Sequence, residues 1–193
     1  MLYLLIGILL ILVIYIFTTY NKFVTTKTRI KASIQEIGNQ LKRQADLIPS
    51  LVDSAKGYMK HEEEIFRSLT DARKAILEAT AANDPQMMMD ASATAQKTLG
   101  RFQALLESTP EIKAVEVVSQ LMAELRDTAD KIMYSRRVLI DLTADYNIMV
   151  VTFPSNLIAG LFHFTQEKGL TVPEEEGFLN VSKEELKTPK VEL

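Results

Sequence analysis

MLYLLIGILLILVIYIFTTY, residues 1–20, decides the fold of this 193-residue chain, because its composition indicates a membrane span. The first charged residue after the start is Lys22. About 20 uncharged residues at ~1.5 Å per residue cross a hydrocarbon core of ~30 Å. A cleaved signal peptide would need basic residues before the apolar run and a small-x-small cleavage site. A buried core helix is the other alternative, but a terminal helix that is apolar all round is more typical of a span. We predict an uncleaved anchor over residues 1–20.

Positive charge follows the span directly. Lys22, Lys27, Arg29 and Lys31 all precede the first acidic residue, Glu36. Because basic flanks stay in the cytoplasm, we predict an outside N-terminus and a cytoplasmic C-terminal domain. The same four basic residues are predicted to contact anionic headgroups at the membrane neck.

The rest of the chain has the pattern of amphipathic helices. From Ile30 onwards apolar residues recur every third or fourth position, with charged residues on the other faces. Breakers at residues 81–85 and 108–110 predict helices over about residues 86–107 and 114–152, followed by a short apolar segment, residues 157–164. The predicted fold class is all-α: the span, then an antiparallel up-and-down bundle of about four helices within residues 21–164. Residues 165–193 are acidic, lack apolar periodicity and are predicted to be a flexible tail. The inward positions of the last long helix are predicted to be Val117, Leu121, Leu125, Ala129, Ile132, Val138, Leu142 and Tyr146.

Pro49 interrupts the first apolar stripe. The stripe keeps its phase through Pro49, which favours one kinked helix continuous with the span. Asp46 is suited to cap a new helix with Pro49 in its first turn, which favours a break. A break also divides the chain into helices of comparable length, and we predict it for that reason.

Composition and motifs argue against several functions. The net charge of −3 gives no support to nucleic-acid binding, and the absence of cysteine excludes disulfides and thiolate metal sites. His61, beside Glu62–Glu64, lacks the further ligands that a metal centre needs, and His163 lies in an apolar segment. No catalytic or phosphate-binding motif is present. We predict no enzymatic activity, no cofactor and no metal.

Several strings resemble a known family. They are Tyr20–Val24, Gln40–Val52 with Leu-Lys-Arg…Asp-Leu-Ile-Pro, Asp145–Asn147, and Phe153–Phe162 with Phe-Pro-Ser-Asn-Leu-Ile-Ala-Gly. In this order and spacing the chain resembles the LemA family of bacterial membrane proteins. The resemblance implies an anchor in the bacterial inner membrane, a cytoplasmic helical bundle and no established enzymatic activity. Some relatives in that family resemble proteins linked to magnetosome membrane formation, which favours a role in membrane organisation.

The family strings supply candidates for a structural or interface motif. In an antiparallel bundle, the polar groups near the last helix should meet those at the membrane edge. An Arg43–Asp46 ion pair would fix a bend at Pro49 if it were buried. The exposed-looking segment with Leu161 and Phe162 is predicted to dock on the membrane or on a neighbouring subunit. The candidates are Tyr20, Asn21, Arg43, Asp46, Pro49, Tyr146, Asn147, Asn156, Leu161 and Phe162.

Two classes of function remain. The first is a self-assembling scaffold, in which anchored copies form homo-oligomers on the bilayer. The second is an adaptor or regulator that binds another membrane protein, such as a protease or a sensor. Both require the lipid bilayer as a partner, and neither involves nucleic acid.

Overall fold

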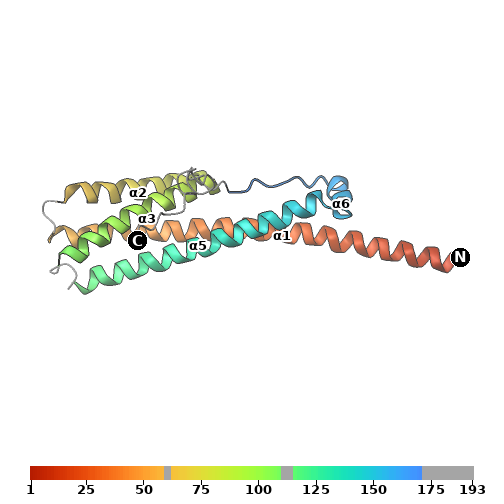
Figure 1. The fold of residues 1–193 in the computed structure, drawn as a ribbon, viewed down its shortest axis with the longest axis horizontal. Helices are drawn as coiled ribbons and strands as arrows, with labels where there is room; N and C mark the ends of the chain where they lie inside the picture. Colours follow the sequence, from red (N-terminus) through yellow and green to blue (C-terminus); the bar gives the residue numbers. More distant parts are fainter. Residues whose placement is uncertain (59–61, 110–114, 171–193) are drawn as a thin grey trace, which may run out of the picture.

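The computed structural model describes residues 1–58, 62–109 and 115–170, which form helices and no strand. The helices are α1 (Leu2–Lys56), α2 (Glu63–Ala82), α3 (Pro85–Ser108), α5 (Glu116–Val151) and α6 (Ser155–Leu161). Helix α1 runs the length of the molecule, α5 lies antiparallel beside it, and α2 and α3 pack together at the end far from the N-terminus (Figure 1). The predicted all-α fold with an antiparallel bundle is confirmed.

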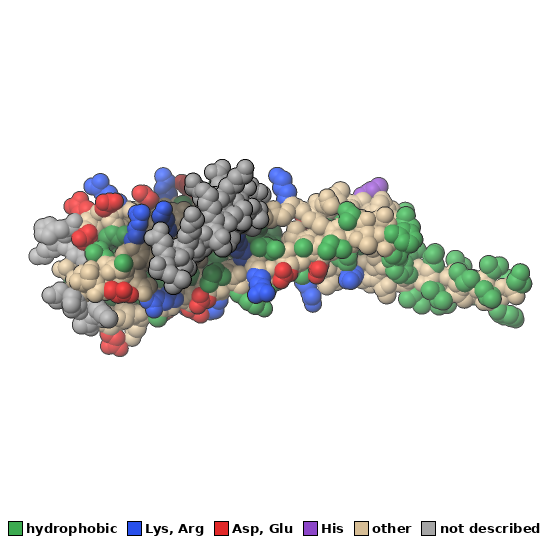
Figure 2. Space-filling model, in the orientation of Figure 1, with side chains coloured by type: hydrophobic (Ala, Val, Ile, Leu, Met, Phe, Trp, Pro, Cys, Tyr) green, Lys and Arg blue, Asp and Glu red, His purple; other side chains and the backbone are tan. Residues whose placement is uncertain are grey.

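The first part of α1 projects from the bundle as a bare helix. Residues 1–14 are all exposed, and α1 carries an apolar stretch long enough to cross a membrane. In Figure 2 this segment is a green projection beyond the charged bundle. A side chain that is apolar and has no partner within the chain is suited to lipid, as expected for a span.

The predicted helix break at Pro49 is wrong, because α1 continues through it to Lys56. In a helix, the amide of residue 49 would bond the carbonyl of Ala45, and proline has no N–H to donate. Arg73 of α2 takes over this role, since its Nε donates to the Ala45 carbonyl at 3.0 Å. Asp46 is therefore an exposed residue inside the helix and caps nothing.

The turn between α2 and α3 follows the sequence prediction. Asn83 ends α2 in the left-handed region, at φ 51°. The Asp84 carboxylate accepts hydrogen bonds from the amides of Gln86 and Met87 at 2.8 and 3.0 Å, with Pro85 in the first turn of α3. This is a standard cap with proline at the first helical position, where its missing donor costs nothing.

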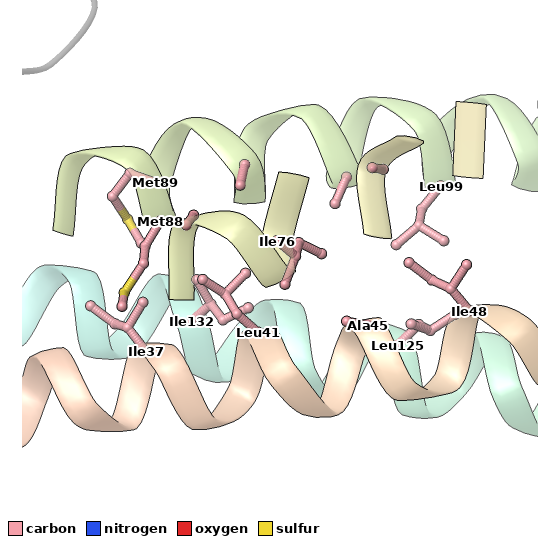
Figure 3. Close-up of a cluster of buried hydrophobic side chains, with 14 of the residues drawn as sticks. Ile37, Leu41, Ala45, Ile48, Ile76, Met88, Met89, Leu99, Leu125 and Ile132 are labelled. Atoms are coloured by element: carbon pink, nitrogen blue, oxygen red, sulfur yellow. The ribbon is translucent and has the colours of Figure 1, made fainter. Parts of the chain in front are cut away.

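The core runs along the bundle from Phe23 and Tyr146 at the neck to the far end. Figure 3 shows Ile37, Leu41 and Ile48 of α1 together with side chains of the other three long helices. On α5 the predicted inward positions are partly wrong. Val117 is exposed, and Leu121, Ala129, Val138 and Leu142 are only half-buried. The fully inward residues of α5 are Val118, Met122, Leu125, Thr128, Ile132, Ser135, Leu139, Thr143 and Tyr146. The true stripe includes small hydroxyl residues, which an apolar count does not register.

Candidate functional site

The densest set of specific contacts lies at the neck, where the bundle meets the apolar segment of α1. An aromatic cluster joins α1 to α5 and to the segment around α6. The ring of Phe23 stacks on Phe164 at 4.8 Å between centroids and meets the edge of Tyr146 at 5.8 Å. Tyr20 lies 4.8 Å from Phe162 and 5.7 Å from Phe164. Such tilted and stacked pairs add to the burial of apolar area, so this cluster fastens the last helices to α1 beside its apolar segment.

Three polar residues hold the chain that follows α6. The Asn147 amide donates to the backbone carbonyl of Glu167 at 2.9 Å and accepts from the backbone amide of Glu167 at 2.9 Å. The Lys27 ammonium lies 2.7 Å from the Glu167 carboxylate. We call Lys27, Asn147 and Glu167 the neck clamp. The predicted tail begins at residue 165, yet its first residues are held against the neck, and residues 171–193 lie outside the described part of the chain.

Two neck residues have shifted pKa values. The pKa of Lys27 is raised above 10.5 by its hydrogen bond to Glu167, against an opposing effect of burial. Burial raises the pKa of Tyr146 above 10.0. Both side chains therefore stay protonated at neutral pH, and Lys27 keeps the charge that its partner needs.

Of the other basic neck residues, Lys22, Arg29 and Lys31 are exposed on α1 just beyond the span. Asn21 and Lys22 line a groove between α1 and α5 together with Asp145. The neck therefore presents basic side chains close to the point where α1 leaves the bundle, where contact with headgroups was predicted.

The short helix α6 has two different faces. Ile158 and Ala159 are buried, whereas Leu157, Leu161 and Phe162 are exposed. Asn156 is half-buried, and its side-chain oxygen has no hydrogen-bond partner among the described residues. The predicted meeting of Tyr20 with the segment around α6 is present in the structure, since its ring lies 4.8 Å from that of Phe162.

The remaining candidates lie far from the neck. Arg43 pairs with Glu124 of α5 at 3.2 Å, and both side chains are half exposed. The expected local pair with Asp46 is replaced by this link across the bundle, which contributes little to stability at such exposure. Sequence reasoning missed Arg73 and Glu167, because their partners are 28 and 20 residues away. The one available signal was Pro49 itself, since an unbroken stripe through proline requires a donor from elsewhere.

The described residues contain no cluster of potential metal ligands. Within the described residues, no group of three or more His, Asp or Glu side chains could hold a metal ion. His163 is exposed, and His61 lies outside the described residues.

Comparison with known proteins agrees with the family strings. The model of the LemA family matches residues 33–183. The Magnetosome protein MamQ of Magnetospirillum gryphiswaldense is 23% identical over 168 residues, covering 75% of this chain and 62% of that protein. This chain therefore spans less than two thirds of the length of that relative. Since the family model matches most of the sequence, the chain belongs to the LemA family.

Proposed function

We propose that this protein is a non-enzymatic scaffold that self-assembles on the bacterial inner membrane, with its N-terminus outside and its bundle in the cytoplasm. The observation that carries the proposal is the continuity of α1, whose 55 residues join the apolar segment to the bundle core without a break. At 1.5 Å per residue this helix is about 80 Å long. Contacts between bundles would therefore act directly on the spans.

An apolar stripe on α5 supports self-assembly. Met133, Ile140 and Ile148 are 54%, 39% and 57% exposed, and exposed Ala144 lies between the last two. Successive members are seven, four and four residues apart, so they share one helix face, away from the core-facing residues. Exposed Arg137 lies on the same face, between Met133 and Ile140. We call Met133, Ile140, Ala144 and Ile148 the α5 stripe.

A second copy is the occupant that fits the α5 stripe best. Anchoring confines all copies to one plane and raises their local concentration. Because α1 fixes the height of each bundle above the bilayer, the stripe of every copy lies at the same level. Identical surfaces at equal height are suited to a symmetric or repeating homo-oligomer.

The orientation rests on charge. Lys22, Lys27, Arg29 and Lys31 follow the apolar segment, and retention of positive charge in the cytoplasm favours a cytoplasmic bundle. The exposed three, Lys22, Arg29 and Lys31, are also available to anionic headgroups.

The alternative is an adaptor that binds another membrane protein. A groove between α1 and α5 favours it, since it combines charged and apolar lining in a form that suits a helix of a partner. The groove is lined by Arg29, Ser33, Glu36, Tyr134, Val138 and Leu142. In this case the protein would remain small when its partner is absent.

The test is the mass of the full-length protein in mild detergent, measured by light scattering and imaged by electron microscopy. A scaffold forms large, regular particles without any other protein. A Met133→Lys, Ile140→Lys double variant should reduce them to small species, because charges on the α5 stripe oppose its burial. The matched control, Gln120→Lys with Ala123→Lys, adds the same charge to exposed positions of α5 outside the stripe and should assemble normally.

The outcomes separate the two functions. A wild-type protein that is monomeric at all concentrations contradicts the scaffold and favours the adaptor. Large particles that survive the stripe substitutions leave self-assembly in place but show that the interface lies on another surface.

A further inference from the structure

Helix α6 lies beside the apolar end of α1, below the charged part of the bundle. Ile158 and Ala159 of α6 belong to the buried cluster, and Tyr15 and Ile16 of the apolar segment pack against that cluster. The contact between Tyr20 and Phe162, 4.8 Å between ring centroids, fixes the same level. In Figure 1, α6 sits where the bare part of α1 begins.

The length of the apolar segment sets the depth of α6. A span needs about 20 residues to cross a ~30 Å hydrocarbon core. The uncharged run of α1 continues through Tyr15 and Tyr20 to Asn21, one residue before the first charge at Lys22. Because this uncharged run includes Tyr15 to Tyr20, we place the membrane boundary at their level, which is the level of α6.

The outward surface at this level carries large exposed apolar side chains, with exposed His163 beside them. Phe153, Leu157 and Leu161 are 75%, 63% and 65% exposed, and Val151 and Phe162 are exposed beside them. We call these five residues the collar. No Asp, Glu, Lys or Arg occurs between Asp145 and Glu167, although charged residues are frequent on both sides of this interval. Figure 2 shows hydrophobic side chains gathered where the bundle narrows into the projecting helix.

We infer that the collar inserts into the interfacial layer of the leaflet next to Lys22, as a second membrane contact beside the span. Short amphipathic segments bury an apolar face at the boundary between headgroups and acyl chains in this way. The depth of α6 makes lipid the occupant, since the collar is continuous with the lipid-exposed surface of α1. This inference goes beyond the proposed function and depends only on anchoring by α1, not on self-assembly.

The chain contains no tryptophan, so a single introduced tryptophan reports its own surroundings. Leu157→Trp and Leu161→Trp place the reporter on the collar at largely exposed sites. Val117→Trp, at the exposed start of α5 far from the span, is the control. Each full-length variant would be reconstituted into phosphatidylcholine–phosphatidylglycerol vesicles with or without brominated acyl chains, after its helical circular dichroism has been matched to the wild type.

Insertion predicts blue-shifted emission and more than about twofold quenching by brominated lipid at both collar sites, with no quenching at residue 117. Equal quenching of collar and control reporters overturns the inference. Blue-shifted emission that brominated lipid does not quench, and that disappears when the protein is diluted with lipid, also overturns the inference. The collar would then contact a second copy of the protein instead of lipid. Because quenching is measured at low protein density, its result does not depend on whether the scaffold forms.

Discussion

The donation of Arg73 to the Ala45 carbonyl predicts a specific energetic coupling with Pro49. Ala45 is fully buried, and the Arg73 guanidinium supplies the donor that Pro49 lacks. Loss of a charged donor to a buried carbonyl costs about 1.5–3 kcal/mol. We expect Arg73→Met, which keeps most of the apolar stem, to lower the free energy of unfolding by about 2 kcal/mol.

The same change should be mild once residue 49 has an amide proton. In a Pro49→Ala background the helix can bond the Ala45 carbonyl itself, so Arg73→Met should cost less than about 1 kcal/mol. The four proteins would be compared by denaturant unfolding of the full chain in detergent, followed by circular dichroism. Arg67→Met serves as control, because its ion pair with Glu63 on the same helix is highly exposed and worth little. An equal cost of Arg73→Met in both backgrounds would refute the role assigned to Arg73.

Three further predictions concern buried polar groups and the neck clamp. Gln44 is fully buried, and neither polar atom of its side chain has a hydrogen-bond partner among the described residues. Gln44→Met should therefore raise the free energy of unfolding by about 1–3 kcal/mol. A loss of stability would show that the Gln44 amide is hydrogen-bonded. Asn147→Ala removes both hydrogen bonds to the Glu167 backbone. Amide hydrogen exchange at Glu167 should then become about tenfold faster or more. An unchanged exchange rate would show that Asn147 does not hold this segment. Lys27 and Tyr146 have raised pKa values in the folded protein, so they bind their protons more tightly when it is folded. Their contribution to folding stability is therefore complete below about pH 10 and is lost as the pH rises through the raised pKa values. A loss of stability at the neck between pH 7 and about 9 would contradict this sign.

Features with local causes were predictable from the sequence. The breaker predicted at residues 81–85 is a local signal, and the structure ends α2 at Ala82 and begins α3 at Pro85. The apolar segment before Lys22 is likewise defined by composition alone. Such signals need no knowledge of what packs nearby.

Features with distant causes were not predictable. The sequence near Pro49 does not show that α1 continues, because the hydrogen-bond donor to the Ala45 carbonyl is Arg73 of α2. On α5 the inward face was misplaced because Thr128, Ser135 and Thr143 occupy core positions. The Thr128 hydroxyl donates a hydrogen bond to the Leu125 carbonyl of the same helix at 2.7 Å. This polar side chain can therefore lie in the core without a hydrogen-bond partner on another helix.

The neck joins the bundle to the apolar segment of α1 without a flexible linker. A span joined to a bundle by a flexible linker would let the two parts turn independently. Here α1 passes through without a break, and the aromatic cluster and the neck clamp fasten α5, α6 and Glu167 to it within two turns of Lys22. Lys27→Ala with Asn147→Ala removes the clamp but leaves α1 intact. We therefore expect this variant to stay anchored while its collar reporter at residue 157 loses part of its quenching, because α6 is then held by the aromatic cluster alone. Unchanged quenching would mean that the rings alone fix the depth of α6.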